Sequence, residues 1–273
     1  MPPIALTLAG SDPSGGAGLQ ADLKTFHQHG VYGTSVVTLL TVQNTQRVSA
    51  VEVMDARFVS AQLEAVLEDV PPTAAKVGAL GDAAVLRAVT RAAARFAFPL
   101  VVDPVMISKH GAALMDEDAR ALLPALLRRA TLVTPNAPEA AALLGRAVTD
   151  LPSARRAATE LAARLGTAVL LKGGHLGEAD AVDVLAIADE RMELRSPRVD
   201  THHTHGTGCT YSAAITARLA WGEPLPQAVR GAKAWLTQAL RTAPGIGRGV
   251  GPLNHLQPLL TSRGAPNGAS EDP

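Results

Sequence analysis

Short apolar runs alternate with longer amphipathic or alanine-rich segments along most of the chain, and this alternation constrains the fold more than any other feature. The strand-like apolar runs lie at Ile4–Ala9, Ser35–Leu40, Ala74–Val77, Leu100–Asp103, Leu132–Thr134 and Ala168–Lys172. The segments with helical spacing lie at Ala17–His29, Arg57–Leu67, Ala83–Phe96, Asp116–Arg128 and Ser153–Leu165. Repeated strand–helix–strand units build a mostly parallel sheet with helices on its faces, so the sequence predicts an α/β fold.

The C-terminal part of the chain departs from this alternation. A strand pair is predicted at Ala181–Ala186 and Arg191–Arg195, followed by two helices at Cys209–Trp221 and Gln227–Thr242. Residues 1–260 contain no linker and no internal repeat, whereas residues 261–273 are rich in glycine, proline, serine and charge. The sequence therefore predicts a single domain over residues 1–260 and a disordered tail over residues 261–273.

Composition excludes several classes of protein. The chain has 273 residues, with 25 basic and 25 acidic side chains, and its formal net charge of zero is unlike that of a nucleic-acid-binding protein. Its single cysteine excludes an intrachain disulfide and is typical of the reducing cytosol. No apolar stretch approaches the ~20 residues of a membrane helix, and no signal peptide is evident. We expect a cytoplasmic protein that binds neither nucleic acid nor membrane.

The segment Thr204–Ala214 joins a glycine-containing turn to the start of an apolar helix. Gly206 and Gly208 allow the backbone to direct N–H groups inward, and the first helical turn leaves four N–H groups without intrahelical partners. Together with the helix dipole, these groups favour an anion such as phosphate. Cys209 lies at this positive end, where a thiolate is stabilised, so it is a candidate base. The structural alternative is a connecting turn with a packed cysteine.

Polar residues follow several predicted strands at the edge where carboxyl ends meet. They lie in the segments Gly10–Gly18, Gln43–Thr45, Asp103–Pro104, Pro135–Glu139 and Lys172–His175. Ligands of doubly wound sheets bind at this edge, so the pattern indicates a site, although loops also carry such residues by chance.

Six motifs together resemble a known family. They are GSDPSGGAGLQADLK from Gly10, VQNT from Val42, DPVM from Asp103, TPNAPEA from Thr134, LKGGH from Leu171 and THGTGCTYSAA from Thr204. These motifs resemble those of the hydroxymethylpyrimidine and phosphomethylpyrimidine kinases of thiamin biosynthesis. They occur in the same order as in that family, and the resemblance covers about residues 4–256. The resemblance implies a ribokinase-like three-layer α/β/α fold and a homodimer. It further implies that ATP with Mg²⁺ phosphorylates 4-amino-5-hydroxymethyl-2-methylpyrimidine and then its monophosphate.

Phosphoryl transfer requires charge compensation, in-line positioning and removal of the hydroxyl proton. The backbone N–H groups of the turn that includes Gly206, Thr207 and Gly208 are expected to contact the transferring phosphoryl group. The resemblance implies that Cys209 is the base, at a position where much of the superfamily carries an aspartate. The helix N-terminus is expected to lower the pKa of the Cys209 thiol.

The resemblance also implies which residues meet ATP and Mg²⁺. Asp103 and Glu139 are the expected magnesium ligands, because Mg²⁺ needs only one or two protein carboxylates and keeps several waters. The residues expected at ATP are Thr204, Asn136, Lys172 and His205. The alternatives are that Asp103 and Asn136 cap turns beside prolines, and that Lys172 is exposed to solvent.

The first glycine-rich segment lacks the Gly-Lys-Ser/Thr ending of a phosphate loop, and the resemblance places it at the substrate ring instead. The residues that match ring-contacting positions are Gly10, Ala17, Gln43 and Val105. Gln43 suits hydrogen bonding to a pyrimidine edge, with a surface amide as the alternative. Ala79 stands where many relatives carry methionine, which leaves room and keeps a pyridoxine or pyridoxal kinase as an alternative function.

Further alternatives concern other classes of protein. A non-catalytic pyrimidine- or nucleotide-binding regulator could share the fold, and a hydrolase with Cys209 as nucleophile would need a neighbouring base. His202, His203, His205 and His175 could hold a transition metal, but no supporting carboxylate pattern or cysteine pair accompanies them. Lys233 resembles a lysine of the family, with a solvated helix face as the alternative.

Overall fold

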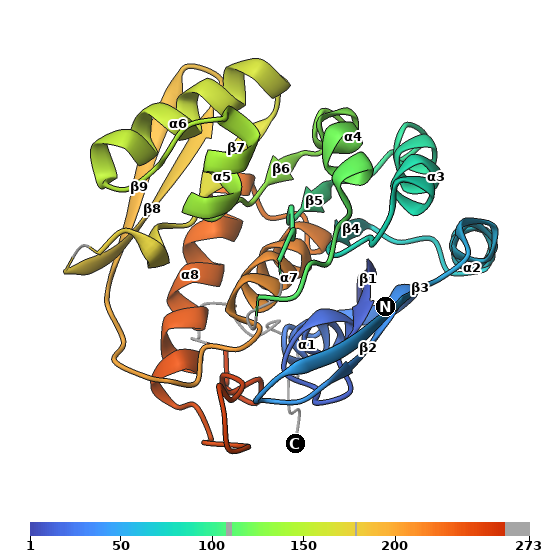
Figure 1. The fold of residues 1–273 in the computed structure, drawn as a ribbon, viewed down its shortest axis with the longest axis horizontal. Helices are drawn as coiled ribbons and strands as arrows, with labels where there is room; N and C mark the ends of the chain where they lie inside the picture. Colours follow the sequence, from blue (N-terminus) through green and yellow to red (C-terminus); the bar gives the residue numbers. More distant parts are fainter. Residues whose placement is uncertain (108–110, 178, 260–273) are drawn as a thin grey trace, which may run out of the picture.

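The structure is a computed structural model that describes residues 1–107, 111–177 and 179–259 (Figure 1). Within this part of the chain, one sheet is formed by β1 (Ile4–Ser11), β2 (Tyr32–Gln43), β3 (Val48–Val53), β4 (Ala74–Val77), β5 (Leu100–Val102), β6 (Leu132–Val133), β7 (Ala168–Leu171), β8 (Asp180–Ile187) and β9 (Glu190–Pro197). Its strand order is β3-β2-β1-β4-β5-β6-β7-β8-β9. The six neighbouring strands β2, β1, β4, β5, β6 and β7 pair in parallel. The pairings β2–β3, β7–β8 and β8–β9 are antiparallel. The predicted mostly parallel sheet is confirmed.

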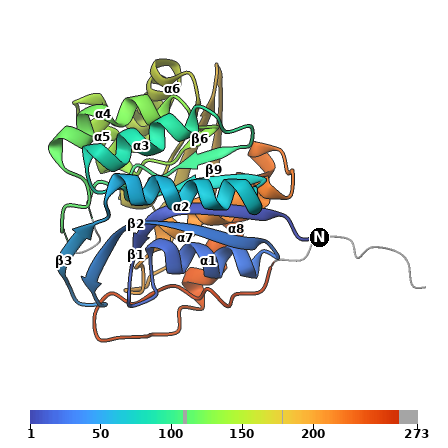
Figure 2. The same ribbon diagram turned by 90° about the vertical axis from the view of Figure 1, so that its right-hand side faces the viewer.

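Helices cover both faces of this sheet and give three layers (Figures 1 and 2). One layer consists of α2 (Ala56–Asp69), α3 (Ala83–Ala93), α4 (Glu117–Leu127), α5 (Ala137–Leu144) and α6 (Leu151–Leu165). The other consists of α1 (Gly18–Gln28), α7 (Thr207–Ala220) and α8 (Leu225–Arg241). Within the described residues, no helix combines the length and the apolar character that crossing a membrane requires.

The first strand shows how the sequence builds the two cores between these layers. Successive residues of a strand face opposite sides of the sheet. Leu6 and Leu8 belong to the core under α2–α6, and Ala5 belongs to the core under α1, α7 and α8. Thr7 also faces the second side, where its hydroxyl donates a hydrogen bond to Asp22 of α1 at 2.6 Å. Both faces of the strand are therefore buried, as expected for a central parallel strand.

The sequence prediction misses two elements. β3 is a half-exposed edge strand, and its alternating valines bury too little surface to form a long apolar run. α5 has only eight residues and carries Pro138 in its first turn, which resembles a break in the sequence. The disordered tail predicted for residues 261–273 lies outside the described residues, and the single-domain organisation stays a prediction.

The order of the strands determines where a ligand site can form. β1 pairs with β2 on one side and with β4 on the other, so the chain winds outward in both directions from this point. Crevices at the carboxyl ends of strands form at such a switch point. The residues that follow β1, β4, β5, β6 and β7 are therefore brought to one edge of the sheet.

Candidate functional site

A cavity of about 610 Å³ lies at this edge of the sheet. All the predicted site residues line it: Gly10, Ala17, Gln43, Asp103, Val105, Asn136, Glu139, Lys172, Thr204, His205, Gly206, Thr207, Gly208 and Cys209. They come from segments that are far apart in the chain and that the fold brings together. Their individual roles stay predictions, but their common location is a property of the structure.

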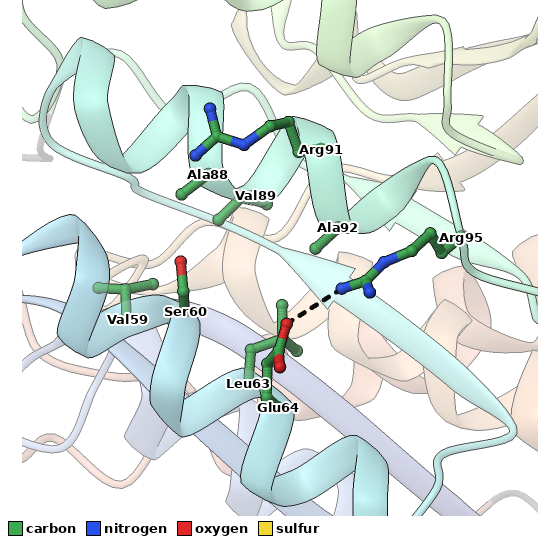
Figure 3. Close-up of a pocket in the computed structure, with 9 residues that line it drawn as sticks. All are labelled: Val59, Ser60, Leu63, Glu64, Ala88, Val89, Arg91, Ala92 and Arg95. Atoms are coloured by element: carbon green, nitrogen blue, oxygen red, sulfur yellow. Dashed lines mark hydrogen bonds and ion pairs between the residues drawn. The ribbon is translucent and has the colours of Figure 1, made fainter.

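A second cavity of about 350 Å³ lies between α2 and α3 (Figure 3). Its floor is apolar, formed by residues such as Val59, Leu63 and Val89, and an ion pair between Arg95 and Glu64 at 3.2 Å crosses it. It shares no lining residue with the larger cavity and contains none of the predicted site residues. We therefore place the candidate site in the larger cavity.

The glycine turn before α7 fits against the first glycine-rich loop. Gly206 has φ +75°, and a Cβ there would overlap the carbonyl oxygen of Gly16. The hydroxyl of Thr207 donates to the carbonyl of Thr204 at 2.7 Å, inside the turn. The amide N–H of Thr210 donates to the carbonyl of Gly206 at 2.8 Å and closes the first helical bond. A glycine is required at position 206 by both conformation and space.

The start of α7 also meets the charged residues that follow β5 and β7. A Cβ on Gly208 would lie 3.4 Å from Lys172 Nζ and 3.5 Å from Asp103 Oδ2. Lys172 Nζ lies 2.7 Å from Asp103 Oδ1 and 3.9 Å from Glu139 Oε2. Its side chain is only 13% exposed, so the alternative of a simply solvated Lys172 is wrong. One end of the cavity thus combines a helix N-terminus, one ammonium and two carboxylates.

Asn136 and Glu139 reach the cavity through the cap of α5. The Asn136 side-chain oxygen accepts from the Glu139 N–H at 2.8 Å, and Glu139 Oε2 accepts from the Asn136 N–H at 2.7 Å. The alternative of Asn136 as a cap is therefore confirmed, whereas Asp103 makes its side-chain bonds to Lys172 and Thr134. Burial raises the pKa of Glu139 to about 7, with Lys172 opposing the shift and Asp103 adding to it.

Cys209 lies where the N-termini of α1 and α7 meet. The backbone N–H of Gly18 hydrogen-bonds to its sulfur. Burial nevertheless raises the pKa of the Cys209 thiol, and the positive charge of Lys76 only partly opposes this shift. The pKa of Cys209 is thus raised overall, contrary to the expected lowering, because burial outweighs the opposing effects of Lys76 and of the Gly18 N–H.

A buried ion pair beside Cys209 is absent from the sequence prediction. Lys76 of β4 lies 2.6 Å from Asp22 of α1, and both side chains are fully buried. Burial acts to lower the pKa of Lys76, but the negative charges of Asp22, Cys209 and Asp103 outweigh it and raise the pKa overall. The signal was available, because a lysine inside the apolar run Ala74–Val77 requires a buried partner.

At the other end of the cavity, three polar side chains are joined. His205 Nε2 lies 2.7 Å from Asp12 Oδ2 and 3.1 Å from the amide nitrogen of Gln43. His205 is 2% exposed and lies against the loop that contains Gly16. The surface-amide alternative for Gln43 is thus wrong, since its side chain is half-buried and bonded.

Two further sequence interpretations can be assessed. Lys233 is 6% exposed and forms an ion pair with Asp183 at 2.6 Å, so the alternative of a solvated helix face is wrong. Within residues 1–107, 111–177 and 179–259, no group of three or more histidine, cysteine or acidic side chains is arranged to hold a metal ion. The side chain of His175 lies outside the described part of the structure.

Comparison with known proteins identifies the family to which this chain belongs. Residues 12–254 match the family described as phosphomethylpyrimidine kinase. The hydroxymethylpyrimidine/phosphomethylpyrimidine kinase of Rhizobium meliloti (strain 1021) is 47% identical over 259 residues, which cover 93% of this chain and 97% of that protein.

Solved structures give the same picture of the fold. The phosphomethylpyrimidine kinase of Clostridium difficile 630 aligns with a TM-score of 0.77 at 40% identity, covering 87% of this chain and 99% of that one. The ADP complex of Bacillus subtilis pyridoxal kinase aligns with a TM-score of 0.87 at 35% identity, covering 94% and 98%. The predicted ribokinase-like three-layer fold is thereby confirmed.

Proposed function

Because this chain belongs to the phosphomethylpyrimidine kinase family, we propose that it transfers a phosphoryl group from ATP to 4-amino-5-hydroxymethyl-2-methylpyrimidine. The same site then phosphorylates the monophosphate to the diphosphate. Both steps belong to thiamin biosynthesis, and the relatives in this family carry names for both activities.

One observation carries this proposal: the N-terminus of α7 stands between two chemically different ends of a single cavity. On one side, Gly208 faces the side chains of Lys172 and Asp103. Both would lie within van der Waals distance of a Cβ added at Gly208. On the other side, Gly10 and Gln43 line the part of the cavity near β1 and β2. A ring alcohol bound at the second end directs its hydroxyl toward a phosphate bound at the first, with Cys209 between them.

The residues at the phosphate end have complementary tasks. Backbone N–H groups at the start of α7 and the ammonium of Lys172 compensate the negative charge of the transferring phosphoryl group. Burial acts to lower the pKa of Lys172, but Asp103 and Glu139 outweigh it and raise the pKa, so this ammonium stays charged. Thr204 and Asn136 also line the cavity, and Asn136 pairs with Lys172 through the backbone.

The donor set at this end also fits Mg²⁺. Asp103 and Glu139 are two buried carboxylates whose mutual repulsion contributes to the raised pKa of Glu139. One or two carboxylates with water and phosphate oxygens are the usual ligands of Mg²⁺. When bound there, Mg²⁺ supplies neutralisation of phosphate charge. Asp103 and Glu139 would hold the ion, and Lys172 compensates part of their negative charge.

Cys209 is the proton acceptor in this proposal. As the substrate oxygen forms its bond to the γ-phosphorus, the bond from that phosphorus to the bridging oxygen of ADP breaks, and the hydroxyl proton moves to the thiolate sulfur. The buried ammonium of Lys76 favours the thiolate electrostatically. The N–H of Gly18 orients the sulfur.

The direct test is product analysis by ³¹P NMR. Purified protein with ATP, Mg²⁺ and the pyrimidine alcohol is expected to yield the monophosphate and then the diphosphate. Binding of the ring without any phosphorylated product would instead support the non-catalytic regulator. Asp103→Asn is expected to weaken the response to Mg²⁺, and an unchanged Mg²⁺ titration would remove Asp103 from the metal site.

A pyridoxal kinase is the second candidate, and Ala79 favours it. This residue is 8% exposed and lines the same cavity as Gly10 and Val105. Its methyl side chain projects less into the cavity than a methionine side chain would. The more heavily substituted pyridine ring then has room. A higher kcat/KM for pyridoxal than for the pyrimidine alcohol would establish this candidate, and Ala79→Met is expected to lower pyridoxal use selectively.

A homodimer is the proposed assembly. Leu40 and Val42 of β2 are 45% and 62% exposed, an apolar surface that a second copy could bury. Light scattering during gel filtration is expected to give twice the chain mass of 28.2 kDa. A monomer at all concentrations would contradict the proposed assembly without affecting the proposed reaction.

A further inference from the structure

In the cluster of Asp12, His205 and Gln43, only Gln43 has a task in the proposed reaction, at the substrate ring, and the hydrogen bonds that hold it are unexplained by phosphoryl transfer itself. It joins three separate segments: the loop after β1, the turn before α7 and the end of β2. The side chains of His205 and Asp12 are 3% and 4% exposed, so water competes little for their hydrogen bond. A role for this cluster in selecting the ring rests on the proposed function, because it requires a ring substrate in the cavity.

The position of one proton can be derived from the surroundings of Asp12. Its carboxylate also accepts from the Ser14 N–H and hydroxyl and from the Gly16 and Ala17 N–H groups, at 2.7–3.2 Å. Burial acts to raise the pKa of Asp12, but hydrogen bonds from His205 and Ser14 outweigh it and lower the pKa to about 2. An ionised carboxylate only accepts, so the 2.7 Å contact places a proton on His205 Nε2.

This proton determines which end of the Gln43 amide can face His205. The amide nitrogen lies 3.1 Å from His205 Nε2, and the amide oxygen lies 3.3 Å from Thr41 Oγ1. Nε2 carries one proton, which it donates to Asp12, so Gln43 faces a positively polarised N–H group with no lone pair left to accept from an amide. The Thr41 hydroxyl already donates to the carbonyl of Ser11 at 2.9 Å, so its oxygen is left to accept.

Both requirements are met when the Gln43 amide turns by 180°. Its oxygen then shares the Nε2 proton of His205 with Asp12 as the longer arm of a three-centre hydrogen bond, and its NH₂ group donates to Thr41, while the outline of the side chain is unchanged. In the opposite orientation two donors face each other at His205. The hydrogen bonds of the cluster therefore select one orientation of the amide.

We propose that His205, held by Asp12, is a positioning residue that fixes the amide orientation of Gln43 and so sets the order of donor and acceptor presented to the substrate ring. A planar amide offers a donor and an acceptor side by side. It matches a ring edge on which an amino group stands next to a ring nitrogen, as in an aminopyrimidine. The same edge with donor and acceptor exchanged meets like groups and is rejected.

Steady-state kinetics separates this role from the contact with ATP that the sequence suggests for His205. We expect His205→Ala to raise KM for the pyrimidine alcohol about tenfold, the effect of one lost oriented hydrogen bond, with KM for ATP unchanged. His205→Gln places an amide donor near the position of Nε2 and is expected to restore most of the affinity. The matched control is His202→Ala, an exposed histidine of the same segment, which is expected to behave as wild type.

A double-mutant cycle tests whether His205 acts through Gln43. In a Gln43→Ala background, His205→Ala is expected to have no further effect on KM for the ring, because the amide it positions is gone. Additive effects, or a rise in KM for ATP, would overturn the inference. Calorimetric binding of the ring alcohol without ATP gives the same comparison for variants with little turnover.

Failure of this role and failure of the proposed function give different results. If wild-type protein phosphorylates neither the pyrimidine alcohol nor pyridoxal, the proposed function fails. If wild type is active and the cycle is additive, only the role of His205 fails. Thermal unfolding of each variant shows whether it has kept its fold. If His205→Ala has not, the KM of His205→Gln for the ring alcohol is compared with that of wild type instead.

Discussion

At the scale of single residues, Cys209 combines a demanding task with an unfavourable environment. A base must lose its proton before or during the reaction, yet burial raises the pKa of this thiol. Lys76 and the N–H of Gly18 are the groups that act in the opposite direction. The fraction of thiolate at neutral pH is therefore small, and activity depends on how far the surroundings stabilise it.

The raised pKa of Cys209 predicts how the reaction depends on pH. For the wild type we expect kcat/KM to rise with pH beyond the range of an ordinary thiol, about 8.5, because the thiolate forms only at higher pH. Cys209→Asp is expected to retain activity and lose this rise, since a carboxylate is ionised far below neutrality. Cys209→Ala is expected to lower kcat by 100-fold or more while ATP binding persists, an effect of the size ~10²–10⁴ typical of a lost general base. A wild-type profile that is level from pH 6 would contradict the assignment.

Glu139 gives a second residue-level prediction. With a pKa of about 7, its carboxyl is largely protonated below pH 7 and ionised above it. Binding of Mg²⁺ then displaces a proton below pH 7, so the affinity for free Mg²⁺ is expected to rise between pH 6 and pH 7 and to level off by pH 8. Titrations of activity with free Mg²⁺ at fixed MgATP measure this. In Glu139→Gln the affinity is expected to be weaker and free of this pH dependence, and an unaltered profile would exclude the role.

Residue identities were the most predictable part of the site. The predicted site residues lie in motifs near the ends of predicted strands, and all of them line one cavity, while their individual roles stay predictions. What the sequence could not supply was the balance of burial against charge at Cys209, since burial depends on segments far apart in the chain. The same holds for His205, whose contact with Gln43 spans 162 positions.

At the scale of elements, the glycine turn before α7 carries a conformational requirement that can be measured separately from its packing. Gly206 has φ +75° and would overlap Gly16 if it carried a Cβ. Gly222, just after α7, has φ +79° and no neighbouring atom within 4 Å of an added Cβ. Both positions therefore disfavour other residues because of their positive φ, but only position 206 also lacks room for a Cβ.

We expect Gly222→Ala to lower the free energy of unfolding by about 1 kcal/mol, the cost of the left-handed conformation for alanine. Gly206→Ala is expected to cost at least about 2 kcal/mol more, because the carbonyl of Gly16 must move, and to abolish turnover. Urea unfolding of both variants gives the comparison. Equal losses would show that the loop containing Gly16 yields easily and does not hold the turn.

Among the elements, long amphipathic helices were predicted well and short capped ones were not. The helix predicted over Asp116–Arg128 corresponds to α4, which begins one residue after Asp116, whereas no helix was predicted where α5 lies. The cap formed by Asn136 and Glu139 was present in the sequence as a capping-box pattern. Its detection would have required weighing a four-residue signal above an apparent break.

At the scale of the whole molecule, Asp12 links loops from both ends of the chain, and its charge contributes to global stability. Its pKa is lowered from 3.8 to about 2 in the folded state, and its side chain is nearly fully buried. A carboxyl whose folded pKa is lowered stabilises the protein above its unfolded pKa, and this stabilisation is lost as pH falls through the folded pKa. The difference corresponds to about 2 kcal/mol.

We therefore expect the stability contribution of Asp12 to be complete near pH 6 and to disappear between about pH 4 and pH 2. Urea unfolding of wild type and Asp12→Asn at a series of pH values measures it. The difference in unfolding free energy between the two proteins is expected to shrink by about 2 kcal/mol over this range. A constant difference would mean that the carboxylate acts through packing alone.

The antiparallel hairpin formed by β2 and β3 stands at the margin of the sheet, outside the central parallel strands that end at Asp103 and Lys172. Gln43 belongs to this hairpin, while the residues assigned to phosphate belong to the centre. A change at Gln43 therefore alters one contact with the ring from a peripheral hairpin, whereas Ala79 and Val105 approach the ring end of the cavity from the central strands.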